Sequence, residues 1–140
     1  MTGYLDSSVL LRALLNQPGA LAEFSNLRTP VSSKLLKTEC LRTLDRSRVL
    51  GLLEEDEYLK AVNELYDGLD SVELIEISDA ILERSGGSFS VALGTFDAIH
   101  LSSALAWREQ AGISPTFLTH DEILGRAAQA LGFQVLGALA

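Results

Sequence analysis

Four acidic residues in separate parts of the sequence have the chemistry of a divalent metal site. They are Asp6, Glu39, Asp97 and Asp121. Two carboxylates about 4 Å apart repel one another by about 4 kcal/mol at an effective dielectric constant of 20. A domain whose whole stability is about 5 to 15 kcal/mol does not hold several such pairs as bare anions. If the four acids converge, we therefore expect protonation or a bound cation to relieve the repulsion.

The available ligand types favour Mg²⁺ or Mn²⁺ as that cation. The sequence has one cysteine, Cys40, and two histidines, which are few of the ligands that zinc prefers. Magnesium is usually shared between one or two carboxylates and a phosphate of the substrate. A water on the metal can attack phosphorus while the metal offsets the charge of the phosphoryl oxygens. The acids therefore favour hydrolysis at a phosphate, with no nucleophilic side chain.

The charge of the chain limits how it could bind a polyanion. Sequence-independent binding to nucleic acid replaces counterions with Lys and Arg, and a net charge of −8 opposes it. A metal ion would invert the sign of the pocket locally. Five basic residues lie within fifteen positions, and they are Lys34, Lys37, Arg42, Arg46 and Arg48. On a helix, Arg42 and Arg46 share the side of Glu39, so we expect these two to contact flanking phosphates.

Alternating strand and helix patterns predict one α/β domain over residues 1–140, with a mostly parallel sheet covered by helices. One strand is expected to end at Leu5 and another to begin at Val31. Further strands are expected at 71–77, 115–120 and 133–136. Helices are expected at 9–16, 20–27, 34–48, 54–68, from 78 or 79 to 86, at 96–111 and at 121–132.

Composition favours a soluble protein of the cytoplasm. No stretch approaches the roughly 18 to 20 apolar residues of a membrane span, and Asp6 interrupts the start where a signal peptide is apolar. A single cysteine excludes an internal disulfide, which fits a reducing compartment. We interpret Cys40 as a small core residue.

The expected helices and strands assign some of the acids to a common edge of the sheet more firmly than others. In open α/β sheets, ligands gather beyond the carboxyl ends of the strands. Asp6 and Asp121 each follow a strand, so both belong to that edge. Asp97 starts a helix with no obvious strand before it, so its placement there rests on helix polarity. Glu39 lies inside a helix, about 60° from the apolar Leu36, and therefore flanks the buried face.

The helix expected at 96–111 is apolar nearly all round, which is typical of a buried helix. It nevertheless carries Asp97 and His100 about 60° apart on one face, beside the small Ala104. Each of these polar groups needs a partner in a buried position. Because hydrolysis by a metal-activated water requires no histidine base, we interpret His100 as structural.

Each acid also has an ordinary structural explanation. Asp6 is suited to a turn and Asp121 to a helix N-cap, where Asp is favoured. Glu39 has Arg42 three positions on, and such a helical ion pair contributes about 0.2 to 0.5 kcal/mol. Asp97 could cap its helix. These alternatives stay open until the positions of the side chains are known.

In this order and spacing, four segments together resemble the PIN domain, and within it the VapC-type toxin ribonucleases of bacterial toxin–antitoxin pairs. The segments are YLDSSVLL (4–11), LLKTECLRTL (35–44), TFDAIHLSSAL (95–105) and FLTHDEILGRAAQALGFQV (117–135). The resemblance covers nearly the whole chain. It implies a three-layer α/β/α fold around a central, mostly parallel sheet.

The resemblance also implies an activity and partners. The activity is Mg²⁺- or Mn²⁺-dependent endoribonucleolytic cleavage of RNA by four catalytic acids, Asp6, Glu39, Asp97 and Asp121, with the three aspartates as metal ligands. Ser8 and Thr119 would contact the acids and orient them without binding the metal themselves. The implied partners are RNA, a small cognate antitoxin of the VapB kind, and a second copy in a homodimer.

Two other functions are weighed against this one. Phosphatases of the haloacid dehalogenase type also place an aspartate after the first strand. They need a second aspartate two residues later, where this sequence has Ser8. A catalytically silent PIN-like module that only binds protein or RNA would be indicated by a missing acid, and all four positions are filled.

Overall fold

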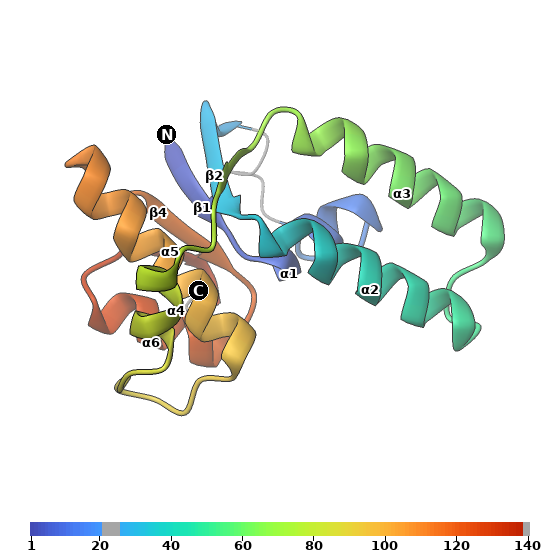
Figure 1. Cartoon of the computed structure of the whole chain (residues 1–140). Coiled ribbons are helices and arrows are strands. Elements are labelled where there is room, and N and C mark those ends of the chain that lie inside the picture. The colour runs from blue at the N-terminus through green and yellow to red at the C-terminus, as the bar shows by residue number, and fades with distance from the viewer. Residues whose placement is uncertain (21–25, 139–140) are drawn as a thin grey trace.

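The computed structural model describes residues 1–20 and 26–138, and within these it has a five-stranded sheet (Figure 1). The strands are β1 Thr2–Leu5, β2 Thr29–Ser33, β3 Glu73–Ile75, β4 Thr116–Thr119 and β5 Val135–Gly137. Their order is β3-β2-β1-β4-β5, and all four neighbouring pairs are parallel. The expected parallel sheet is confirmed, with β1 at its centre.

The helices lie on both faces of the sheet. They are α1 Ser7–Leu14, α2 Leu35–Val49, α3 Glu55–Leu69, α4 Asp79–Ser85, α5 Thr95–Ala111 and α6 Glu122–Ala130. Successive side chains of a strand point to opposite faces. Tyr4 and Phe117 accordingly pack with residues of α5 and α6, whereas Leu5 and Leu118 pack with Val9 of α1. The predicted three-layer α/β/α arrangement is therefore confirmed.

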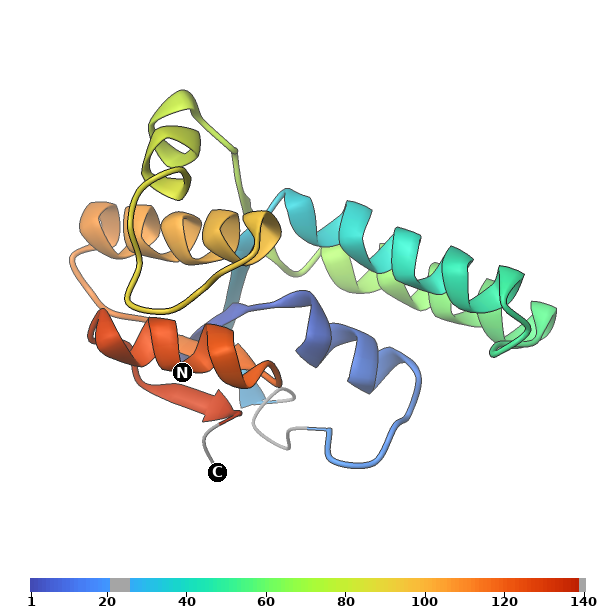
Figure 2. The same cartoon turned by 90° about the horizontal axis from the view of Figure 1, so that it is seen from below.

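Helices α2 and α3 form a hairpin that extends away from the sheet (Figures 1 and 2). Its buried seam consists of Leu36, Cys40 and Leu44 from α2 with Ala61 and Leu65 from α3, and Leu10 of α1 packs against it. Cys40 is thus the core residue expected from the sequence. A hairpin joined to the sheet at the start of α2 places the first turns of α2 beside the carboxyl end of β1.

The limits of α5 follow from its flanking glycines. Gly94 occupies the N-cap position, and Gly112 ends the helix at φ 75°, a left-handed conformation that glycine adopts without strain. Asp97 therefore lies in the first turn of α5 and is not its cap, so the capping explanation for this acid is wrong.

Some expected elements differ from the structure. The strand expected at 71–77 is reduced to Glu73–Ile75, because this edge strand pairs with β2 over three residues only. The short helix expected at 20–27 lies largely outside the described residues. Within the described ranges, none of the helices combines the length and the apolar character needed to cross a bilayer.

Candidate active site

Asp6 lies at the carboxyl end of the central strand, between β1 and α1, and is 4% exposed. Ser8 Oγ and Thr119 Oγ1 both donate hydrogen bonds to its Oδ2, at 2.6 and 2.7 Å. Ser7 Oγ lies 3.4 Å from the other oxygen, Oδ1. Although Asp6 stands at the N-cap position of α1, its carboxylate makes no capping hydrogen bond. A local turn or cap does not explain why this carboxylate is buried.

The same hydroxyls tie Asp6 to the end of β4. Thr119 Oγ1 accepts a hydrogen bond from the backbone N–H of Asp121 at 3.0 Å, and Ser8 Oγ accepts one from the backbone N–H of His120 at 2.9 Å. Asp121 is exposed and caps α6, since its Oδ1 accepts from the backbone N–H of Leu124 at 2.9 Å. The capping explanation for Asp121 is therefore correct as far as Oδ1 is concerned.

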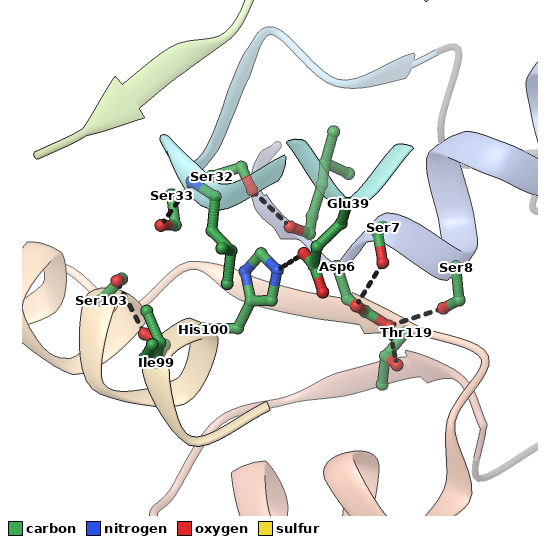
Figure 3. Close-up of polar contacts among 12 residues, drawn as sticks. Asp6, Ser7, Ser8, Ser32, Ser33, Glu39, Ile99, His100, Ser103 and Thr119 are labelled. Atoms are coloured by element: carbon green, nitrogen blue, oxygen red, sulfur yellow. Dashed lines mark hydrogen bonds and ion pairs between the residues drawn. The ribbon is translucent and has the colours of Figure 1, made fainter. Parts of the chain in front are cut away.

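Glu39 approaches the same edge from α2 and is held by His100 of α5. Figure 3 shows Glu39 extending toward Asp6 with the imidazole of His100 on its other side. His100 Nε2 donates to Glu39 Oε1, and the other ring nitrogen, Nδ1, lies 2.8 Å from the hydroxyl of Tyr4. Burial lowers the pKa of His100, but the hydrogen bond and the charge of Glu39 outweigh burial and raise it.

Asp97 is the acid whose pKa is affected by the charges of the other three. Its pKa is raised to about 6, first by burial and then by the negative charges of Asp6 and Asp121, with a smaller contribution from Glu39. A pKa raised by three other carboxylates indicates that their charges act on one region. The structure therefore brings the four acids into one electrostatic neighbourhood at the carboxyl edge of the sheet.

The four acids do not converge into one compact group of metal ligands, the arrangement that the sequence analysis considered. Among residues 1–20 and 26–138, no three His, Cys, Asp or Glu side chains lie together closely enough to hold a metal ion. The physical reason is that separate partners hold them: hydroxyls bind Asp6, His100 binds Glu39, and a helix N-terminus binds Asp121.

Comparison with known proteins identifies the family. The family model of the PIN domain matches residues 3–130. The chain belongs to the PIN domain family. Ribonuclease VapC46 of Mycobacterium tuberculosis is 30% identical over 137 residues, which cover 95% of either chain. The resemblance to VapC-type PIN domains that the sequence indicated is thereby confirmed.

Two solved structures share the fold of this PIN domain. One is a chain in the crystal structure of VapBC2 from Rickettsia felis bound to a DNA fragment from their promoter. Its TM-score is 0.61 at 16% identity, with 96% of this chain and 97% of that chain covered. The other is PAE2754 from Pyrobaculum aerophilum, with a TM-score of 0.59 at 19% identity and coverage of 99% and 86%.

Among the described residues, none of the salt bridges joins a basic residue of α2 to Glu39 in this PIN domain. Arg42 is exposed and pairs with Asp45 at 3.1 Å, so an ion pair between Arg42 and Glu39 is not the explanation for Glu39. Arg46 is also exposed. Both guanidinium groups are accessible to an anionic ligand from solvent.

Tyr4 and His120 lie at the site although the sequence analysis did not assign them to it. Tyr4 is fully buried on β1, two positions before Asp6, and its place on the α5 face of the strand is the signal that could have revealed it. His120 is half-buried, and its Nε2 has no hydrogen-bond partner among the described residues.

The donor set of the PIN domain fits a hard divalent cation. Asp6, Asp97 and Asp121 offer only carboxylate oxygens, which Mg²⁺ and Mn²⁺ prefer. Burial and then the negative charges of Asp6 and Asp121 raise the pKa of Asp97, and a bound cation would favour its ionised form. One or two direct carboxylate ligands satisfy Mg²⁺, which retains several waters. The separated acids are therefore compatible with this metal.

We expect Asp97 to make the stability of the metal-free domain depend on pH. Its pKa is higher in the folded protein, about 6, than the 3.8 of a free side chain. The folded state thus binds the extra proton, and stability falls as pH rises through about 6. With chelator at pH 7.5, Asp97→Asn should be more stable than the natural protein by about 1 kcal/mol, after allowance for solvent screening of this half-buried group.

Urea denaturation at several pH values measures this difference. The advantage of Asp97→Asn should largely disappear near pH 4, where the carboxyl is protonated in the folded state and about half protonated in the unfolded chain. Asp79→Asn, which removes an exposed acid from the first turn of α4, is the charge control and should bring no gain in stability at pH 7.5, because an acid at this position favours the helix. A stability difference that is the same at pH 4 and pH 7.5 would contradict the mutual repulsion of the acids.

Proposed function

We propose that this PIN domain is a Mg²⁺- or Mn²⁺-dependent endoribonuclease toxin of the VapC type, acting in the cytoplasm on RNA phosphodiester bonds. The observation that carries the proposal is a buried carboxylate, Asp6, at the carboxyl end of the central parallel strand, toward which Glu39 extends. Burial and the charges of the other three acids also raise the pKa of Asp97. The name of the relative from M. tuberculosis, a ribonuclease, supports RNA as the substrate.

In this proposal the three aspartates Asp6, Asp97 and Asp121 hold the metal. The ion, when bound, offsets charge on the phosphoryl oxygens and increases the acidity of a water molecule. Ser8 and Thr119 fix the orientation of Asp6 through hydrogen bonds to its Oδ2. Its other oxygen, Oδ1, receives neither of these two bonds. Glu39 Oε1 is occupied by His100, so Oε2 is the atom suited to accept a proton from the attacking water.

Arg42 and Arg46 are proposed to bind phosphates next to the cleaved bond. Both are exposed on α2, the helix that carries Glu39. A guanidinium binds phosphate with two parallel hydrogen bonds, and Arg42 would exchange its partner Asp45 for such a contact. Binding of this kind makes affinity for RNA fall as salt rises.

The test of this function is cleavage of a mixed-sequence RNA by the purified protein. We expect internal cuts with Mg²⁺ or Mn²⁺ and none in the presence of EDTA. Cleavage that persists in EDTA would contradict a metal-activated water. Binding of RNA without cleavage in either metal would instead support the silent binding module.

We also propose a small antitoxin of the VapB kind and a homodimer as partners. The fold shared with a chain of the VapBC2 complex supports the first. A short reading frame directly upstream should encode the antitoxin, and its co-expression should relieve the growth arrest that the PIN domain causes. Light scattering should give about twice the 15.1 kDa of one chain.

A further inference from the structure

A buried tyrosine and histidine lie directly behind Glu39. Tyr4 and His100 are both 0% exposed, and their rings meet edge to face with centroids 5.8 Å apart. A carboxylate can only accept a hydrogen bond, so the contact with Glu39 requires a proton on His100 Nε2. With Tyr4 at Nδ1, both ring nitrogens are engaged, and the imidazole cannot turn without losing both contacts.

Glu39 needs such a partner because of where it lies. Its side chain is 15% exposed and extends toward Asp6 (Figure 3). Repulsion from Asp6 and Asp97 favours conformations that carry the carboxylate outward to solvent, and its side-chain torsions allow that movement. The hydrogen bond from His100 opposes the outward movement.

In the described part of the chain, Glu39 forms its salt bridge with His100 and with none of the cations on α2, Arg46 included. Arg42 and Arg48 both pair with Asp45. Lys37 lies over the ring of Tyr66, 4.6 Å from its centroid. His100 is therefore the group that holds Glu39, and it does so from an element 61 positions away in the sequence.

We propose that His100, fixed by Tyr4, is a positioning residue that keeps Glu39 directed toward Asp6 with Oε2 free. The inference rests on the proposed function in so far as Glu39 takes part in cleavage, whereas the contact itself is independent of that function.

Two amide substitutions at His100 test whether this residue positions Glu39 or only stabilises the fold. Gln places its amide nitrogen near the position of His Nε2, so His100→Gln can still donate to Glu39. Asn is one methylene shorter, and His100→Asn cannot reach Glu39. Both remove the imidazole, and each loses one of its two hydrogen bonds, because Asn reaches only the position of Nδ1 beside Tyr4 and Gln reaches that of Nε2 beside Glu39. Their melting temperatures should therefore fall by similar amounts.

The expected result is a difference in cleavage without a matching difference in stability. His100→Asn should cleave RNA about 30-fold more slowly than the natural protein, because a misplaced catalytic group loses rate steeply, while His100→Gln should stay within about fivefold. Equal loss of cleavage in the two variants, at equal melting temperature, would overturn the proposal.

A double-mutant cycle with Glu39→Gln tests whether His100 acts through Glu39. If it does, adding His100→Asn to Glu39→Gln should cause no further loss of cleavage. Independent, multiplying losses would overturn the proposal. If His100→Asn does not fold, Tyr4→Phe replaces it in the cycle, since it removes only the hydroxyl and keeps the stacking on Phe117.

A measurement without metal or RNA distinguishes failure of this inference from failure of the proposed function. In chelator, the Nε2 proton of His100 should give a slowly exchanging NMR signal that shifts far downfield because it is bonded to a carboxylate. The signal should move or vanish in Glu39→Gln. An unchanged signal in Glu39→Gln would show that the contact does not exist, whether or not the natural protein cleaves RNA.

Discussion

Replacing Asp6 with asparagine is expected to slow RNA cleavage by about 1,000-fold while the domain stays folded. The substitution keeps the size of the side chain, and the amide oxygen can still accept from Ser8 or Thr119. It removes the negative charge that the metal would bind. Loss of one strong electrostatic contact to the reacting centre reduces rates by about 100-fold to 1,000-fold, and this buried acid lies at the centre of the sheet edge.

The melting temperature of Asp6→Asn shows whether slow cleavage comes from the lost charge or from a damaged fold. Removing one of several like charges lowers repulsion, so the melting temperature of metal-free Asp6→Asn should equal or exceed that of the natural protein. Asp79→Asn on α4 is the control for loss of a negative charge elsewhere and should cleave normally. A well-folded Asp6→Asn protein that cleaves within tenfold of the natural rate would exclude Asp6 as a metal ligand.

The centre of the sheet was predictable because β1, β2 and β4 are short, largely buried and followed by clear helix signals. Asp6 and Asp121 could be assigned to one edge because the carboxyl ends of parallel strands meet there. The position of Asp97 was harder to derive. The connection from β3 to β4 passes through α4 and α5 and crosses β2 and β1, so α5 begins at the edge without a strand before it.

The identity of each acid's partner could not be read from the sequence. Helical spacing offered Arg42 to Glu39, but Arg42 pairs with Asp45 on the exposed side of α2. Glu39 instead meets His100, which reaches it only after α2 and α5 have both packed at the sheet edge. Local spacing gives candidate pairs, whereas the choice among them depends on long-range packing.

At Asp121, a large effect on RNA cleavage can be separated from an effect on the stability of α6. Its Oδ1 caps α6 through the backbone N–H of Leu124, and an asparagine caps a helix about as well as an aspartate. Asp121→Asn should therefore keep its free energy of unfolding within about 0.5 kcal/mol, whereas Asp121→Ala should lose about 1 kcal/mol.

Cleavage should not follow that order if Asp121 also contributes charge to the metal. Both variants remove the carboxylate, and the charge of Asp121 is one of those that raise the pKa of Asp97. We therefore expect both to cleave RNA about 100-fold more slowly, despite their different stabilities in urea. Normal cleavage by Asp121→Asn together with slow cleavage by Asp121→Ala would mean that the cap is the whole role of this residue. The proposed metal site would then consist of Asp6 and Asp97, with Glu39 held beside them by His100.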